Sequence, residues 1–307
     1  MKKNVSVLVL VVLAIGFCAS CGAGAGPGIK AEKEGVEWGL RDFITYLQDT
    51  VPGLGYRTTD QGTNSGTAVF LRGLAGVDGI SVQASEDPAA AKDLVFLAKG
   101  NGYDAFSWGR FVFLDYENSR LSKTLMALYQ GLLTEGKTKK TLKGTWEGTI
   151  ERSDVSFIFD GKEFKMSIHD SNYIVVFKGS YTATNDNLSL KFTHAGSSLS
   201  NFNGRFFEGA FEATVDDIDI TERQLAEINS LVETEDYGKL AAYLTTNFKQ
   251  FFSVDKDYLW ATLPADSDFV SAISSETPYF RFNTRLIMVL GGDVEEDDSW
   301  FDLTLKE

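Results

Sequence analysis

Only two residues of the chain could carry thiol chemistry, Cys18 and Cys21, and both lie near the N-terminus. They follow a positive start, Met1-Lys2-Lys3, and an apolar run over 5–17. That run has about a dozen residues, fewer than the ~20 that a membrane-spanning helix needs. A basic start, a short apolar core and small residues after it are typical of a secretory signal peptide. The sequence therefore predicts export, with a signal peptide over 1–20.

The residues around the second cysteine, Ala19-Ser20-Cys21-Gly22, resemble the cleavage site of bacterial lipoproteins. The resemblance implies cleavage before Cys21 and a palmitate-type lipid anchor on that residue. It also implies secretion across the inner membrane and attachment to the cell membrane or the outer membrane. Gly22 is not the Asp that resembles an inner-membrane retention signal, which favours the outer membrane. Two alternatives stay open: an ordinary signal cleaved nearby, and an uncleaved membrane anchor.

The charge balance excludes several classes of partner. The chain has 43 acidic and 29 basic residues, a net charge of −14 at pH 7. Nucleic acid needs a basic face, and anionic lipid head groups repel an acidic protein. We therefore expect no nucleic-acid partner, and membrane attachment only through the anchor at Cys21. With Cys18 removed and Cys21 acylated, no thiol is left for a disulfide, for catalysis or for a metal.

Little else in the sequence points to catalysis. The only histidines are His169 and His194. His169 is out of phase with the apolar residues of its predicted strand and His194 is in phase with those of its own, so we expect them to face different ways. The acidic clusters at 216–219 and 293–298 lack the spacing of a calcium-binding EF-hand loop. We predict no cofactor, no metal and no catalytic residue. A pair of carboxylates acting as a hydrolase stays open, because such pairs form in space and not along the chain.

The first part of the chain predicts a tether and then a small α+β domain. Residues 21–34 hold the cysteine and a Gly/Ala-rich tether, and residues 35–135 form the domain. The apolar periodicity and the residues that start or stop helices and strands predict three helices and three strands. We expect the helices to pack on one sheet formed by the strands. The helices are expected over 36–49, over 88–100 after Asp87, and after Asn118 or Ser119. The strands are expected over 68–74, 80–84 and 107–115.

From residue 141 to 307 the apolar period changes to two, which is typical of strands. Asp160-Gly161 predicts a tight hairpin turn between two of them. A helical insert is expected over 221–250, where Thr221 and Gln224 form a capping box. Strands are expected on both sides of this insert, and about nine of them are enough to close an antiparallel up-and-down barrel. Those expected after residue 200 lie at 205–215, 258–263, 279–290 and 299–306.

Two short motifs in this part resemble those of lipocalins. Gly144-Thr145-Trp146 resembles the Gly-x-Trp opening of that family. Residues 179–190 resemble its recurring hairpin, with Gly179-Ser180-Tyr181 before the turn and Leu188-Ser189-Leu190 after it. The resemblance implies an α+β chain that ends in a lipocalin-like β-barrel, with an apolar ligand inside or a rigid scaffold. It also implies an arginine from a late strand over Trp146, for which Arg281 and Arg285 are the candidates.

The aromatic side chains of this part are expected to point mostly into the barrel, where they either fill the core or line a cavity. The candidate ligand-binding residues are Trp146, Phe157, Phe159, Phe164, Phe177, Tyr181, Phe192, Phe211, Trp260 and Phe282. We rank a lipoprotein that binds a small, lipid-like apolar ligand first. A non-enzymatic structural or interaction lipoprotein, with a filled barrel and an envelope protein partner, comes second. A carboxylate-based hydrolase comes third. A dry cavity favours the first, whereas a packed core with an exposed apolar patch favours the second.

Overall fold

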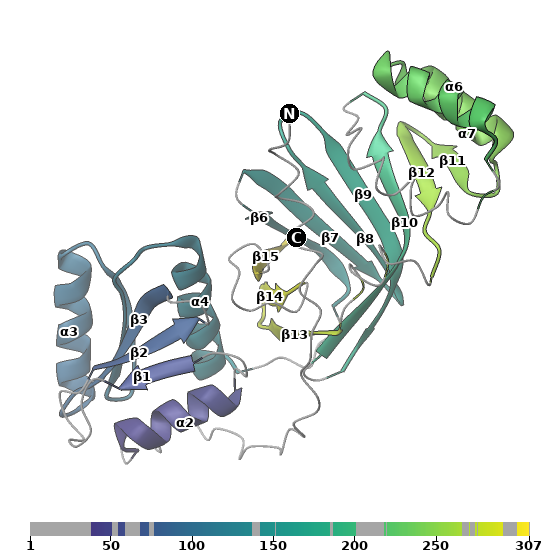
Figure 1. Cartoon of the computed structure of the whole chain (residues 1–307). Coiled ribbons are helices and arrows are strands. Elements are labelled where there is room, and N and C mark those ends of the chain that lie inside the picture. Colours follow the sequence, from purple (N-terminus) through teal and green to yellow (C-terminus); the bar gives the residue numbers. More distant parts are fainter. Residues whose placement is uncertain are drawn as a thin grey trace.

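The computed structural model contains five helices and two antiparallel sheets in the part of the chain that it describes (Figure 1). The described residues are 38–50, 55–58, 68–73, 77–136, 142–150, 152–184, 187–200, 218, 220–265, 270, 274, 276–290 and 300–306. The helices are α2 (Leu40–Thr50), α3 (Pro88–Gly100), α4 (Arg120–Thr134), α6 (Glu222–Glu233) and α7 (Tyr237–Asn247). The chain therefore has an α+β fold, with the two sheets at successive stretches of the sequence.

The first sheet has the strand order β1-β2-β3-β5-β4. Its strands are β1 (Gly55–Thr58), β2 (Ala68–Gly73), β3 (Val77–Ala84), β4 (Asp104–Trp108) and β5 (Phe111–Asp115). Helices α2 and α4 cover one face, where Phe111 and Phe113 are buried. Helix α3 covers the other face, where Ala91 packs on Val112 and Leu114. The helices therefore lie on both faces of this sheet, because alternate side chains of β5 are apolar in both directions.

The strand predicted over 107–115 is wrong, because a turn divides this stretch. The stretch 107–115 was expected to be a single strand, but it is the end of one strand, a turn and all of another. Gly109 adopts a positive φ of 55°, which glycine tolerates without a Cβ clash, and the chain reverses there. The predicted helix starts are confirmed: Asp87 accepts hydrogen bonds from Ala89 and Ala90, and Ser119 caps α4.

The second sheet contains a closed ring of eight strands. In ring order these are β6, β7, β8, β9, β10, β13, β14 and β15, and β15 pairs back to β6. The members are β6 (Gly144–Ile150), β7 (Ser153–Asp160), β8 (Glu163–His169), β9 (Ile174–Ala183), β10 (Asn187–Ser198), β13 (Glu276–Arg281), β14 (Arg285–Val289) and β15 (Trp300–Lys306). Every neighbouring pair is antiparallel, and the predicted hairpin at Asp160-Gly161 is present with Gly161 at φ 63°.

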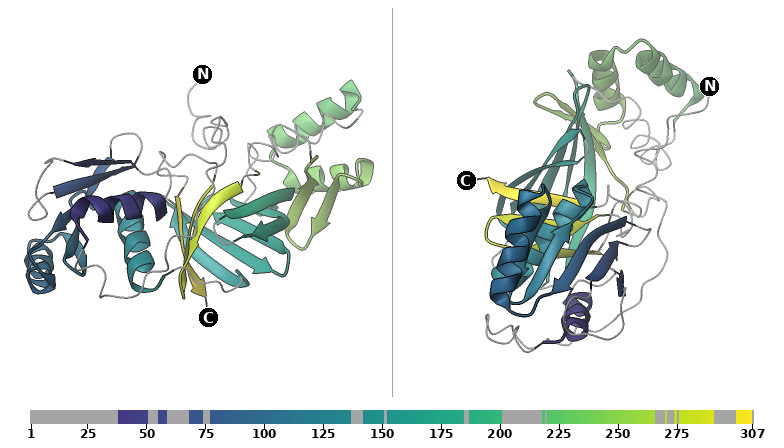
Figure 2. Two further views of the ribbon diagram at one scale, coloured as in Figure 1. Left: turned by 90° about the horizontal axis from the view of Figure 1, so that it is seen from below. Right: turned by 90° about the vertical axis from the view of Figure 1, so that its left-hand side faces the viewer.

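Two further strands, β11 (Phe252–Asp255) and β12 (Tyr258–Thr262), extend β10 outside this ring. Helices α6 and α7 pack on them through a separate apolar cluster that contains Ile228 and Leu244. The predicted capping box is present, since the Thr221 hydroxyl accepts from the Gln224 N–H and the Gln224 side chain accepts from the Thr221 N–H. The insert therefore forms a lobe at the far end of the molecule from the first sheet (Figure 2).

The stretch 279–290 was expected as one strand, but it forms the β13–β14 hairpin, with the Phe282 N–H donating to the Arg285 carbonyl across the turn. The polar pair Asn283-Thr284 is the signal that could have located this turn. The strand expected at 205–215 lies outside the described residues, as do the signal peptide and Cys21.

The two sheets are joined by an apolar interface between α4 and the outer side of β13, β14 and β15. The same buried cluster holds Leu125, Leu128 and Leu132 of α4 together with Phe280, Phe282, Ile287, Val289 and Trp300; we call it the interdomain cluster. The Arg120 guanidinium donates to the Trp300 carbonyl at 3.0 Å. A Cβ placed on Gly131 would lie 2.7 Å from the ring of Phe282, so only glycine allows this approach. This interface was not predicted from the sequence.

Among the helices of the described residues, none is both long enough and apolar enough to cross a bilayer.

Candidate functional site

Most of the predicted ligand-binding residues lie together inside the ring. Trp146, Phe157, Phe159, Phe164, Phe177 and Phe192 belong to one buried cluster, which we call the interior cluster, and Tyr181 packs at its border. They come from β6, β7, β8, β9 and β10, whose alternate residues face inward. The sequence pattern of period two therefore placed these seven side chains correctly.

Two of the predicted residues lie elsewhere, and a third is not described. Phe282 belongs to the interdomain cluster, so its ring points out of the strand ring and not into it. Trp260 lies opposite Gly196 on β12, on the face away from Leu259 and Ala261, and outside the interior cluster. Both residues fall where sequence alternation alone cannot decide the face, because Phe282 lies at the start of a turn and Trp260 lies on a strand outside the ring. Phe211 is outside the described residues.

The aromatic side chains of the interior cluster contact one another inside the ring of strands. The ring centres of Phe159 and Tyr181 are 4.9 Å apart, and those of Phe164 and Phe192 are 5.0 Å apart. Phe192 also lies 5.4 Å from Phe177, with the planes nearly perpendicular. These distances are typical of direct edge-to-face packing. In this region aromatic side chains from four neighbouring strands therefore serve as packing partners for each other.

Trp146 anchors the other part of the interior cluster. It is fully buried, and its indole N–H donates to the Leu142 carbonyl at 2.8 Å. The Arg281 guanidinium lies 5.1 Å from the centre of the indole, within the range of a cation–π contact. Arg281 thus takes the place expected for a late-strand arginine. The other candidate, Arg285, instead donates to the two carboxylate oxygens of Asp302, with its Nε at 2.6 Å from Oδ1.

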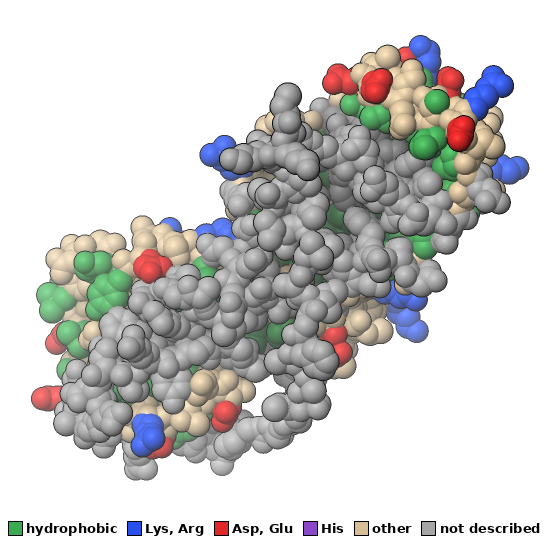
Figure 3. Space-filling view, viewed as in Figure 1, with side chains coloured by type: hydrophobic (Ala, Val, Ile, Leu, Met, Phe, Trp, Pro, Cys, Tyr) green, Lys and Arg blue, Asp and Glu red, His purple; other side chains and the backbone are tan. Residues whose placement is uncertain are grey.

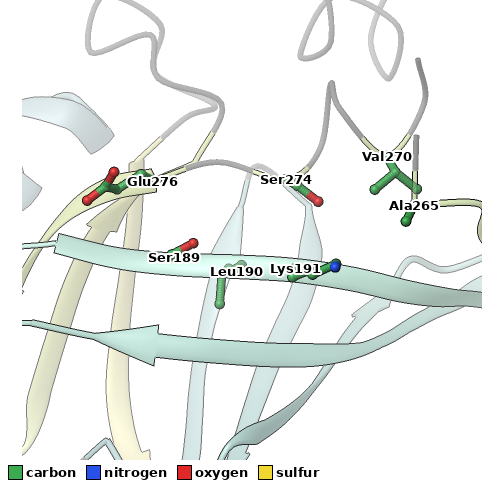
Figure 4. Close-up of a pocket in the computed structure, with 7 residues that line it drawn as sticks. All are labelled: Ser189, Leu190, Lys191, Ala265, Val270, Ser274 and Glu276. Atoms are coloured by element: carbon green, nitrogen blue, oxygen red, sulfur yellow. The ribbon is translucent and has the colours of Figure 1, made fainter. Parts of the chain in front are cut away.

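A pocket opens where strand β10 changes partners (Figure 4). On one edge of β10, residues 187–189 pair with β13 and residues 194–198 pair with β12. The stretch between them, 190–193, is paired with β9 on its other edge and with neither β12 nor β13 on this one. The pocket there has a volume of about 320 Å³ and includes Leu190 and Val270, both members of the interior cluster. Lys191 and Glu276 supply charges at its edge. Its volume is at the lower end of that of small-molecule sites.

Among the described residues, the two large apolar side chains with the highest exposed fractions lie on helix α3, together with a third exposed one. Phe96 is 78% exposed, Leu97 59% and Leu94 40%. Hydrophobic side chains gather over α3 on the face drawn in Figure 3. Just beyond the helix, Tyr103 and Tyr116 are also exposed, and their ring centres are 5.4 Å apart. We call Leu94, Phe96 and Leu97 the α3 patch.

Helix α3 leaves this patch exposed because it contacts the sheet through small residues. Ala91, with Val95 and Ala98 beside it, makes the contact, and these positions are four and three residues apart. The four consecutive apolar residues 94–97 cover more than one side of a helix of 3.6 residues per turn. This unbroken apolar run is the signal in the sequence that more than one side of the helix is apolar.

The titratable groups of the described residues give little sign of acid–base catalysis. Among the carboxylates, the resolved shifts are at Asp170 and Asp236, and hydrogen bonds, the largest from Ser171 and Lys239 respectively, hold both pKa values below the ordinary value. A general acid needs the opposite shift. Burial, assisted by Lys178, lowers the pKa of His194. Within the described ranges, no group of three His, Cys, Asp or Glu side chains is arranged to hold a metal.

Comparisons of this chain with protein-family models, with curated protein sequences and with solved structures found no match. The functional conclusion therefore rests on the chain's own geometry.

Proposed function

We propose that this chain is a non-enzymatic, lipid-anchored protein of the bacterial cell envelope, and that it acts by binding a protein partner at the α3 patch. In this proposal Cys21 carries the anchor, the Gly/Ala-rich segment is the tether, and the ring of strands is a rigid, filled scaffold. The observation that carries the proposal is the exposure of Phe96 and Leu97 on an otherwise well-packed domain.

The contrast between the ring interior and α3 supports a surface function. Inside the ring, Phe157, Phe159 and Phe164 are almost completely buried among other rings. On α3, three large apolar side chains face solvent along one helix. Contiguous apolar patches are uncommon on the surface of a soluble monomer, and where they occur they often mark an interaction site. Aromatic anchors such as Phe96 supply most of the binding energy in protein interfaces.

The charges around the α3 patch favour a protein partner over a bilayer. At 100° per residue, Asp93 projects between Phe96 and Leu97, in the middle of the exposed face, and it is itself exposed. A carboxylate at that position would have to enter the membrane together with the two apolar side chains, which is unfavourable. In a protein interface, a partner lysine or arginine can pair with it.

A photo-reactive phenylalanine analogue at position 96 tests this proposal in intact cells. We expect one defined crosslinked protein, because the probe replaces the most exposed aromatic side chain of the patch. The same analogue at Leu225, an apolar residue of α6 with 43% exposure, is the matched control and should give no such product. Replacing Leu94 and Leu97 by serine in the position-96 chain should remove the product. A Cys21→Ser chain should no longer be found in the membrane fraction, and it should not give the crosslinked product either.

Two results would contradict the proposal. The first is no patch-dependent product at position 96, and the second is a product consisting only of lipid, which would assign α3 to the membrane surface.

The pocket beside β10 supports a second candidate function, the binding of a small apolar ligand. Leu190 and Val270 connect it to the interior cluster, so an apolar group could reach buried side chains from outside. We rank this function second because the pocket is small and the neighbouring aromatic rings already contact each other. Co-purification of an apolar molecule is the finding that would reverse this order.

A further inference from the structure

A group of cationic and aromatic side chains lies on the outer face of β8, β9 and β12. We call Lys165, Lys178, Tyr258 and Trp260, with Asp255, the cation–aromatic cluster. The strand register brings it together: Lys165 pairs with Lys178, and Gly196 pairs both with Trp260 and with Val176. Since Phe177, the neighbour of Val176, faces the interior cluster, these residues face outward.

Both lysines lie over aromatic rings. The Lys178 Nζ is 3.6 Å from the centre of the Trp260 indole, and the Lys165 Nζ is 5.3 Å from the centre of the Tyr258 ring. The two rings are themselves 6.1 Å apart. Gly196 permits this arrangement, because a Cβ there would lie 2.8 Å from Cε3 of the indole. The ammonium groups are therefore held above a fixed aromatic surface.

Among the described residues, the indole N–H of Trp260 has no acceptor. Trp260 is only 3% exposed, and its Nε1 makes no hydrogen bond within the described structure. A buried donor without an acceptor is unfavourable and is uncommon in folded proteins. The same ring that leaves this donor unused lies directly beneath the Lys178 ammonium. Because this N–H is buried, the indole serves the cluster as the ring beneath the Lys178 ammonium and does not itself face solvent.

The positive charge of the cluster is only partly balanced. Burial is the main cause of the lowered pKa of Lys165, and repulsion by Lys178 and Lys256 lowers it further. Asp255 opposes this shift, but it is largely exposed, and it lies 3.9 Å from the Lys178 ammonium. Two lysines directly opposite each other on neighbouring strands repel. A local excess of positive charge therefore exists in a chain whose net charge is −14.

We propose that the cation–aromatic cluster binds a phosphate-type oxyanion, with Lys165 and Lys178 as its positive partners and the Trp260 indole as the ring beneath Lys178. An oxyanion offers acceptor oxygens to both ammonium groups and relieves the repulsion between the lysines. Lysine is a common partner of phosphate, and charge-assisted hydrogen bonds are the strongest that a protein makes. The phosphate could belong to a soluble molecule or to a phospholipid head group. This site is independent of the α3 patch.

The test follows the indole N–H signals by nitrogen–proton NMR on the chain from residue 22 to 307. The probe is inorganic phosphate, with chloride at matched ionic strength as the reference. We expect one indole signal to move saturably with phosphate, and Trp260→Phe should remove that signal and so assign it. Lys178→Met and Lys165→Met keep the aliphatic stems and should each weaken binding about tenfold or more. Lys143→Met, an exposed lysine paired with Asp160, should leave binding unchanged.

Further titrations separate the two sources of phosphate. Glycerol phosphate reports on a soluble ligand, whereas phosphatidylglycerol vesicles, compared with phosphatidylcholine vesicles, report on a head group. A response to either that depends on Lys178 supports the proposal. The proposal is overturned if no probe moves the Trp260 signal beyond the effect of chloride. It is equally overturned if Lys178→Met responds as the wild type does, since the shift would then reflect an adventitious ion only.

Discussion

Replacing Gly131 by leucine is expected to lower the free energy of unfolding by about 2–4 kcal/mol and to separate the two domains. Gly131 lies in α4 where the helix meets Phe282, and even a Cβ would lie 2.7 Å from that ring. Phe282 is 2% exposed within the interdomain cluster, so it has no space into which to withdraw. The larger side chain therefore has to push α4 away from β13 and β14.

Differential scanning calorimetry and binding of an apolar dye measure this effect. We expect the Tm to fall by roughly 5–10 °C, the dye to bind, and the far-ultraviolet circular dichroism to stay nearly constant, because each sheet persists. Gly238→Leu is the matched control, since Gly238 is an exposed helical glycine of α7 where an added Cβ would meet only the Asp236 Oδ1, at 4.0 Å. An unchanged Tm in Gly131→Leu would mean that the domains do not rest on this contact.

Replacing Trp146 by alanine is expected to cost about 3–5 kcal/mol of unfolding free energy. The indole is fully buried in the interior cluster and lies under Arg281. The loss of the indole leaves a cavity and leaves the Leu142 carbonyl without its donor. The Arg281 guanidinium also loses its cation–π contact. Each of these consequences destabilises the folded state, and a buried polar group that loses its partner adds to the cost.

Urea unfolding of Trp146→Ala and Phe96→Ala compares two large aromatic side chains in opposite environments. Phe96→Ala should change the free energy of unfolding by less than about 0.5 kcal/mol, since its ring is mostly in water. Trp146→Phe should fall between the two, because it keeps most of the volume and loses the hydrogen bond. Equal costs for Trp146→Ala and Phe96→Ala would contradict the filled-scaffold account.

Local signals in the sequence predicted local structure well. Asp87 followed by Pro88, and Thr221 followed by Gln224, each specify a helix start through a side chain that accepts backbone N–H groups. Likewise, period-two alternation placed Phe157, Phe159 and Phe164 inside the ring, since a strand alternates its faces whatever its neighbours are.

Features that depend on distant parts of the chain were not predictable in the same way. The outward position of Phe282 depends on α4, which lies about 150 residues earlier in the chain. The position of Trp260 depends on β12 pairing with β10 across an insert of two helices. The exposure of Phe96 depends on α3 using alanines for its contact. A sequence pattern shows that a residue is apolar, but the partner that buries it is set by the tertiary fold.

We propose that the ring is a filled scaffold and that the chain acts at its surface. Native mass spectrometry of residues 22–307, purified from a bacterial host and followed by solvent extraction, tests whether the ring is filled. We predict the mass of the polypeptide without a bound apolar molecule, and no uptake of fluorescent fatty acids, because the interior aromatic rings already contact each other. A lipid that co-purifies in a one-to-one ratio, and that Leu190→Arg at the pocket displaces, would contradict it.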